Sequence, residues 1–99
     1  KALEAVKAVS AAGKYVAAIC AGPTVLADLH ITDGKNATCY PGCEADLADS
    51  YTAAAIERDG NIITACGPGV SFDFGFAIVE YFCGPQTVAP LRSQMQFDR

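Results

Sequence analysis

The apolar run at residues 15–19 (YVAAI) constrains the fold more than any other segment of this 99-residue chain. Its residues do not alternate between apolar and polar, which is typical of a strand covered on both faces in a parallel sheet. Parallel strands are joined by helices, and helical patterns lie on either side of the run, at residues 2–12 and 23–29. The sequence therefore predicts an α/β fold.

Turn signals and apolar periodicity place the remaining elements. Arg58-Asp59-Gly60 is a good hairpin signal between two strands, and Gly67-Pro68-Gly69 breaks the second one. Ser71 is placed to cap a helix that Gly84-Pro85 stops. The predicted elements are a short strand at residues 35–40, a loop at 44–50, hairpin strands at 51–56 and 61–65, a helix from residue 71, and a final short helix at 87–96.

Length and charge limit the domain count and the partners. The chain is long enough for one domain at most, so we assign residues 1–99 to part of a single domain, and its start inside a helical pattern indicates a fragment. With 52% hydrophobic residues it is expected to fold. A net charge of −4 without a basic cluster argues against nucleic acid or a membrane surface as partner. No apolar stretch approaches the roughly 20 residues that span a bilayer.

The cysteines indicate a reducing compartment. Their number is odd, and their spacing fits neither a paired disulfide framework nor a zinc site. We therefore expect reduced thiols, no metal and a cytoplasmic location. Cys39 and Cys43 lie four residues apart, but without a second pair or a nearby His a metal or disulfide role is not favoured. The five cysteines are Cys20, Cys39, Cys43, Cys66 and Cys83.

Cys20 is the strongest candidate for a reactive group. It follows the predicted strand, and Ala21-Gly22-Pro23 then turns the chain tightly into a helix, which is the pattern of a nucleophile elbow. The N–H groups and dipole of a helix N-terminus favour thiolate over thiol and can hold an oxyanion. The alternative is that Cys20 is a small buried apolar residue at a strand end. The local pattern leaves both interpretations open.

Four longer motifs occur in a fixed order. They are AAICAGPT at residues 17–24, GKNATCYPG at 34–42, DGNIIT at 59–64, and a Gly-Pro-Gly loop at 67–69 followed by FDF and AIVE. Together they resemble the ThiJ/PfpI family, and within it the DJ-one branch that includes the Parkinson-disease protein. The resemblance covers nearly the whole chain but only the carboxyl-terminal half of such a protein, so we expect the amino-terminal strands to be absent.

The resemblance implies a fold and two alternative functions. The fold is a flavodoxin-like three-layer sandwich of the class I glutamine amidotransferase-like type, usually dimeric. The first function is a cofactor-independent glyoxalase or deglycase that acts on methylglyoxal or its adducts, with Cys20 as nucleophile. The second is a non-catalytic oxidative-stress sensor or chaperone-like dimer in which Cys20 is oxidised to sulfinate. The family takes a carboxylate and a glycine pair from its amino-terminal half, so residues 1–99 alone are expected to be inactive.

Carried over residue by residue, the resemblance makes the Ala21 N–H an oxyanion donor, with Tyr40, Gly67 and Pro68 as active-site neighbours. Tyr40 stands where some members have His, and a group with a pKa near 10 is a poor base at neutral pH. The alternative interpretation of Tyr40 is an aromatic residue of a strand that packs on the core. Cys66 replaces an Arg of the human-like pattern, which puts an anion contact in doubt. A buried spectator is favoured over a second redox thiol there.

Two further sets of polar residues are not expected to act with Cys20. His30 follows it by ten residues along a helix, roughly 15 Å away, which is too far for a Cys-His pair. We expect His30 to be a surface residue near a helix end. Asp73 and Glu80 are separated by about 10 Å of helix, too far to share a proton, and are expected to cap and solvate their helix.

Overall fold

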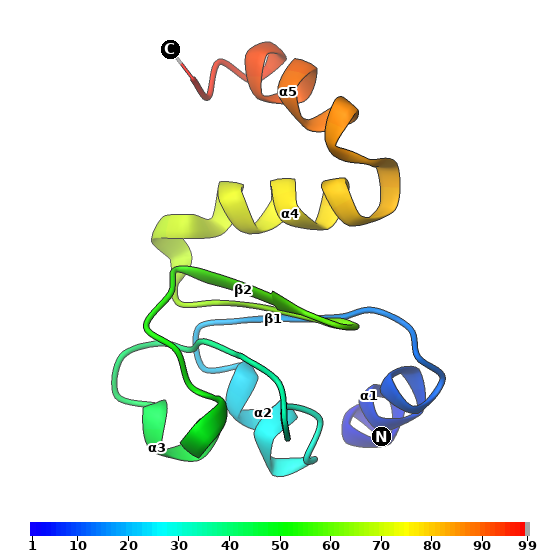
Figure 1. Ribbon diagram of the computed structural model, residues 1–99, viewed down its shortest axis with the longest axis vertical. Helices are drawn as coiled ribbons and strands as arrows, with labels where there is room; N and C mark the ends of the chain where they lie inside the picture. The colour runs from blue at the N-terminus through cyan, green and yellow to red at the C-terminus, as the bar shows by residue number, and fades with distance from the viewer. Residues whose placement is uncertain (99) are drawn as a thin grey trace.

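A three-stranded mixed sheet organises the computed structural model, which describes residues 1–98 (Figure 1). The strands are β1 (Val16–Ile19), β2 (Ile56–Asp59) and β3 (Ile62–Ala65), in the order β1-β3-β2. β1 pairs with β3 in parallel, and β2 pairs with β3 antiparallel. The predicted first strand and the hairpin are therefore confirmed.

The hairpin strands are shifted from their predicted positions. Asp59 still pairs with Ile62, so only Gly60 and Asn61 remain for the turn. Gly60 has φ +58°, a left-handed conformation that a two-residue hairpin turn requires and that glycine adopts without strain. The tight turn explains why the first hairpin strand is Ile56–Asp59 rather than 51–56.

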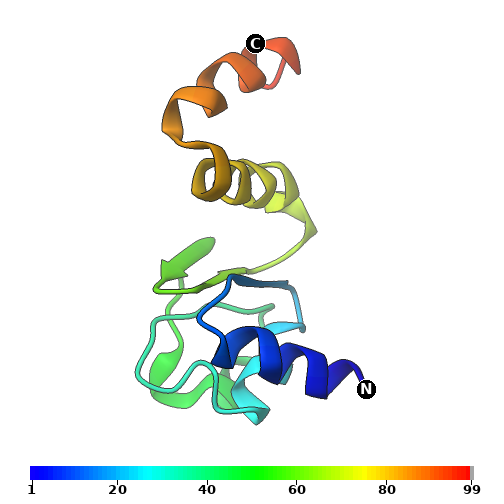
Figure 2. The same cartoon turned by 90° about the vertical axis from the view of Figure 1, so that its right-hand side faces the viewer.

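Helices cover both faces of the sheet (Figures 1 and 2). On one side α4 (Ser71–Cys83) packs against β3, and α5 (Pro85–Gln94) lies beyond α4, away from the sheet. On the other side are α1 (Ala2–Ala11), α2 (Pro23–Asp28), α3 (Glu44–Leu47) and the short 3-10 turn η1 (Ala48–Ser50). A second 3-10 turn, η2 (Pro68–Val70), leads from β3 into α4. None of the helices in residues 1–98 is long and apolar enough to cross a membrane.

The central strand is the most buried element. All four residues of β3 are buried, and Ile62 joins Ala37, Cys39 and Leu47 in one core cluster. β1, in contrast, lies at the edge of the sheet and exposes Ala17. Ala17 is exposed and the other three residues of β1 are half-buried, so within the described residues the predicted burial of this strand is incomplete.

Residues 35–40 do not form the predicted strand. Ala37 makes one isolated bridge with Tyr51, accepting from Thr52 N–H and donating to Ser50 O at 2.8 Å each. The next backbone N–H, of Thr38, donates to the side-chain oxygen of Thr64 at 2.9 Å. Residues 35–40 are therefore held between the Ser50–Thr52 segment on one side and β3 on the other by single contacts instead of a continuous strand ladder.

Residues 44–50 are helical rather than a loop. The Glu44 carboxylate accepts from the Gly42 N–H at 2.7 Å, and acidic residues in the first turn of α3 favour helix formation. Leu47 is buried in the core cluster and holds this turn in place. Ser71 also differs from its prediction. Helix α4 begins there, but the Ser71 hydroxyl donates to Pro68 O at 2.7 Å instead of capping the helix.

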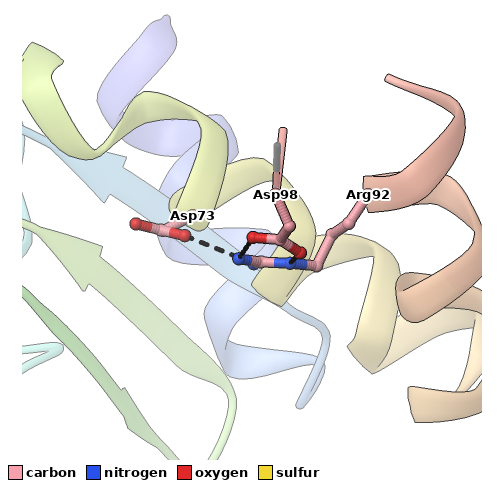
Figure 3. Close-up of polar contacts among 3 residues, drawn as sticks. All are labelled: Asp73, Arg92 and Asp98. Atoms are coloured by element: carbon pink, nitrogen blue, oxygen red, sulfur yellow. Dashed lines mark hydrogen bonds and ion pairs between the residues drawn. The ribbon is translucent and has the colours of Figure 1, made fainter. Parts of the chain in front are cut away.

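Arg92 ties α5 to α4 (Figure 3). It donates two hydrogen bonds of 2.7 Å to the Asp98 carboxylate and lies 3.5 Å from Asp73. Its guanidinium also lies over the rings of Phe76 and Phe97, 4.9 and 4.6 Å from their centroids. The hydrogen bonds from Arg92 lower the pKa of the Asp98 carboxyl below its usual value.

Glu80 pairs with a different arginine, Arg58, at 2.9 Å. Asp73 and Glu80 therefore do not share a proton, as predicted. Each one makes an ion pair that connects its helix to another element.

Candidate functional site around Cys20

Cys20 directly follows β1 at the carboxyl edge of the sheet. Its N–H donates to Ala65 O of β3 at 3.0 Å, which extends the β1–β3 pairing by one step. Its φ is +61°, in the left-handed region that costs a residue with a side chain about 1–2 kcal/mol. Strain of this kind concentrates at functional sites. The half-buried Cys20 thus has the backbone geometry of a nucleophile elbow.

The turn after Cys20 is fixed by short-range contacts. The Gly22 N–H donates to Ile19 O at 3.0 Å, and a Cβ on Gly22 would lie only 3.0 Å from that oxygen. Ala21 O accepts from both the N–H and the hydroxyl of Thr24, at 3.0 and 2.6 Å. The Ala21 N–H makes no hydrogen bond within residues 1–98, and Ala21 is exposed. This N–H is therefore free to serve an oxygen of a bound molecule.

Tyr40 is brought to the same place. Its N–H donates to Cys20 O at 2.8 Å. A Cβ on Gly67 would lie 3.4 Å from the Tyr40 ring, so the ring lies against this glycine. The side chain is 51% exposed, which excludes the alternative of a core aromatic. Pro68 follows Gly67 and is exposed at the start of η2. The predicted neighbours Tyr40 and Gly67 thus lie together beside the elbow.

The structure also shows the environments of Cys66 and His30, two further residues considered in the sequence analysis. Cys66 follows β3, the partner strand of β1, and is half-buried, with its N–H donating to Ala55 O at 3.0 Å. The sequence favoured a buried position for Cys66, and the structure instead leaves it half-exposed. His30 is exposed and its Nδ1 lies 3.1 Å from the Asp33 carboxylate, so it is the surface residue that was predicted.

Two threonines position the Tyr40 segment, Thr38 within the motif at residues 34–42 and Thr64 within the motif at residues 59–64. Thr64 is completely buried and accepts from Thr38 N–H, while the Thr38 hydroxyl donates to Ala54 O at 2.7 Å. Sequence reasoning missed both residues, because threonine is common in strands for its shape alone. The available signals were the place of both threonines in these motifs and, for Thr64, a polar residue within an otherwise apolar run.

The described residues leave the surroundings of Cys20 open. A cavity of about 210 Å³ lies elsewhere, between α4 and α5, with Phe72, Phe76 and Met95 in its wall. In the part of the chain that is described, no three His, Cys, Asp or Glu side chains gather as a metal site. Cys20, the free Ala21 N–H and the Tyr40 ring therefore form one side of a site at the sheet edge.

A parallel strand that ends on a strained cysteine before a helix defines this chain as an α/β fragment with a nucleophile elbow. Residues 1–81 match the DJ-1/PfpI family, and the chain belongs to that family. The predicted resemblance is therefore confirmed, and the fold is a fragment of the DJ-1 fold.

Relatives and solved structures agree with this assignment. The chain is 38% identical over 84 residues to the Parkinson disease protein 7 homolog of Danio rerio, which covers 81% of this chain and 44% of the relative. It is 35% identical over 72 residues to a deglycase of Pyrococcus abyssi, covering 70% of this chain and 43% of the relative. The structure of oxidised Toxoplasma gondii DJ-1 matches 98% of this chain and 54% of its own, with a TM-score of 0.90 and 25% identity. The chain thus spans about half the length of these proteins.

Proposed function

We propose that this chain carries the nucleophile of a cofactor-independent glyoxalase or deglycase that acts on methylglyoxal or its adducts. The observation that carries the proposal is the strained backbone of Cys20, with φ +61°, at the end of a parallel strand. One relative, from Pyrococcus abyssi, is named a deglycase. Cys20 is the nucleophile in this proposal, and Ala21 supplies a backbone donor.

The proposed reaction starts with addition of the Cys20 thiolate to the aldehyde carbon. A C–S bond forms, and the carbonyl oxygen takes the electron pair and is held by the Ala21 N–H. A carboxylate then moves a proton from the first to the second carbon through an enediolate, which leaves a thioester. Water hydrolyses this thioester to lactate and frees the thiol. The carboxylate and the remaining oxyanion donors belong to the part of the family fold that this chain does not span.

Tyr40 and Gly67 shape the proposed substrate site. The Tyr40 ring lies against Gly67, and the backbone N–H of Tyr40 donates to Cys20 O. These two contacts hold Tyr40 beside the nucleophile. The phenol hydroxyl of Tyr40 can donate a hydrogen bond to a bound carbonyl oxygen. We assign to the Tyr40 side chain the role of orienting the aldehyde substrate.

A second function rests on the same free donor. A sulfinate on Cys20 would find the unpaired N–H of Ala21 next to it, and a solved relative is described as oxidised. In this alternative the protein senses oxidative stress, and Cys20 turns over no substrate.

Lactate formation from methylglyoxal tests the proposal, with the protein at its full natural length. Wild type, Cys20→Ala and Cys83→Ala are compared, since Cys83 is an exposed cysteine on α4 and serves as the matched control. We expect Cys20→Ala to lose at least 10²-fold in rate, the order expected for loss of a nucleophile, and Cys83→Ala to match wild type. Equal rates for all three proteins contradict the proposed enzymatic role of Cys20. Peroxide-dependent addition of two oxygens at Cys20, without turnover, supports the sensor.

We further propose a cytoplasmic homodimer that contains the amino-terminal part of the family fold. Within residues 1–98 no strand pairs with the edge of β1 that faces away from β3, and this supports the presence of the amino-terminal part, since an open strand edge is normally paired or covered. Light scattering of the full-length protein tests the dimer, and a mass of one copy contradicts it.

A further inference from the structure

Cys39 and Cys43 share one core cluster. Cys39 is only 2% exposed and belongs to the cluster with Leu47 and Ile62, and the half-buried Cys43 packs against the same cluster. Spacing alone did not favour a pair, but the structure packs both cysteines into or against the same core cluster.

The turn between the two cysteines reverses the chain. The Cys43 N–H donates to Tyr40 O at 3.0 Å, and Gly42 has φ +105°, which glycine permits. This hydrogen bond closes a four-residue turn from Tyr40 to Cys43, so the chain doubles back directly after Cys39. The same turn carries Tyr40, whose N–H is bonded to Cys20 O.

The two thiols differ in their access to an oxidant. Burial, Cys43 and the carboxylates of Glu44 and Asp46 all raise the pKa of the Cys39 thiol, so Cys39 stays protonated and reacts slowly by itself. Cys43 is the more exposed of the two and meets solvent first.

We propose that Cys39 and Cys43 are a redox pair that hydrogen peroxide converts to an intramolecular disulfide across the Tyr40-Pro41-Gly42 turn. The Cys43 sulfur first attacks the peroxide, which breaks the O–O bond and gives a sulfenic acid and one water. The Cys39 sulfur then attacks the Cys43 sulfur, an S–S bond forms, and the second water leaves with the Cys39 proton. The two thiols lose two electrons in total, and the peroxide gains them.

The disulfide would act on the elbow through Tyr40. It would fix the turn that holds the Tyr40 ring on Gly67 and the Tyr40 N–H on Cys20 O. The pair does not depend on catalysis by Cys20, so it is independent of the proposed function.

Peptide mapping tests the pair in the full-length protein. Trypsin cuts after Lys35 and Arg58, and residues 36–58 contain Cys39 and Cys43 but no other cysteine. After mild hydrogen peroxide, denaturation and iodoacetamide, we expect this peptide to lack both alkyl groups and to be lighter by two hydrogen atoms. Dithiothreitol should restore two alkylation sites. The Cys20→Ala variant should behave in the same way, which separates this test from that of the enzyme.

Variants with one cysteine replaced, together with amide hydrogen exchange, complete the test. Cys43→Ser should leave Cys39 alkylated, whereas Cys66→Ser, the matched control, should leave the disulfide intact. Oxidation should also slow hydrogen exchange at the Tyr40 amide at least several-fold, and reductant should reverse the change. The proposal is overturned if the peptide of residues 36–58 stays doubly alkylated, gains oxygens, or is cross-linked to another peptide. An unchanged Tyr40 exchange rate in the disulfide form overturns its link to the elbow.

Discussion

The side-chain oxygen of Thr64 accepts a hydrogen bond from the backbone N–H of Thr38, 2.9 Å away, inside the core. This contact ties the segment that leads to Tyr40 directly to β3. The position of one wall of the candidate site therefore depends on a buried hydroxyl.

Replacing Thr64 by Val should release this contact while keeping the side-chain shape. A buried N–H without a partner costs about 1–3 kcal/mol, so we expect Thr64→Val to lower the free energy of unfolding by that amount. Hydrogen exchange at the Thr38 amide should accelerate. Thr64→Ser keeps the acceptor, and its Thr38 amide should stay protected. Equal protection of Thr38 in both variants would show that this hydrogen bond contributes nothing.

The strain at Cys20 predicts an unusual order of stabilities. A residue with a Cβ pays about 1–2 kcal/mol at a left-handed φ, and glycine does not. Cys20→Gly should therefore be more stable than Cys20→Ala by about 1 kcal/mol, although glycine usually destabilises a folded chain. Urea unfolding of the two variants measures the difference. If Cys20→Ala were more stable than Cys20→Gly, the assignment of a strained backbone at Cys20 would be wrong.

Gly22 should tolerate no side chain. Its Cβ would lie 3.0 Å from the Ile19 carbonyl oxygen, and this backbone atom cannot rotate away. We expect Gly22→Ala to cost about 1–3 kcal/mol, as overpacking does, and to lower the reactivity of Cys20 toward iodoacetamide. The control is Gly69→Ala, because a Cβ on Gly69 meets nothing within 4 Å. A Gly22→Ala protein as stable as Gly69→Ala contradicts a tight turn.

The Asp98 carboxyl should titrate below its usual pH range. Arg92 lowers its pKa by hydrogen bonding, with Asp73 as the other carboxylate facing the guanidinium. Because the folded-state pKa is depressed, the stabilisation is present above the ordinary Asp pKa of about 3.9 and is lost as the pH falls through the depressed value. NMR titration of the Asp98 carboxyl carbon measures this. In Arg92→Gln the midpoint should rise toward the ordinary value, and an unchanged midpoint contradicts the pair.

Much of this architecture could be predicted from local patterns. Apolar runs, Gly and Pro gave the strand before Cys20, the hairpin at Gly60 and the two last helices within a few residues. The elbow was predicted because the turn that it needs has a local signature in Ala21-Gly22-Pro23. These features depend on neighbours in the sequence.

The failures involve partners that are far apart in the sequence. Residues 44–50 looked like a polar loop, but burial of Leu47 in a distant core makes them helical. Thr38 and Cys43 carry no local signal of their contacts with Thr64 and with the core cluster. The exposure of β1 at Ala17 depends on which strands stand beside it, and a single strand's sequence does not contain that information.

The order of the strands in the sheet also bears on how the chain acquires its shape. β2 and β3 are joined by a two-residue turn, whereas β1 and β3 pair residues that are 46 positions apart, such as Val16 and Ile62. Closing a short loop costs less entropy and is faster than closing a long one. The hairpin is therefore expected to form first and β1 to dock late. The Cys20 elbow is then among the last features to mature during folding, so newly made chains would hold an unstrained and unselective thiol until β1 is in place.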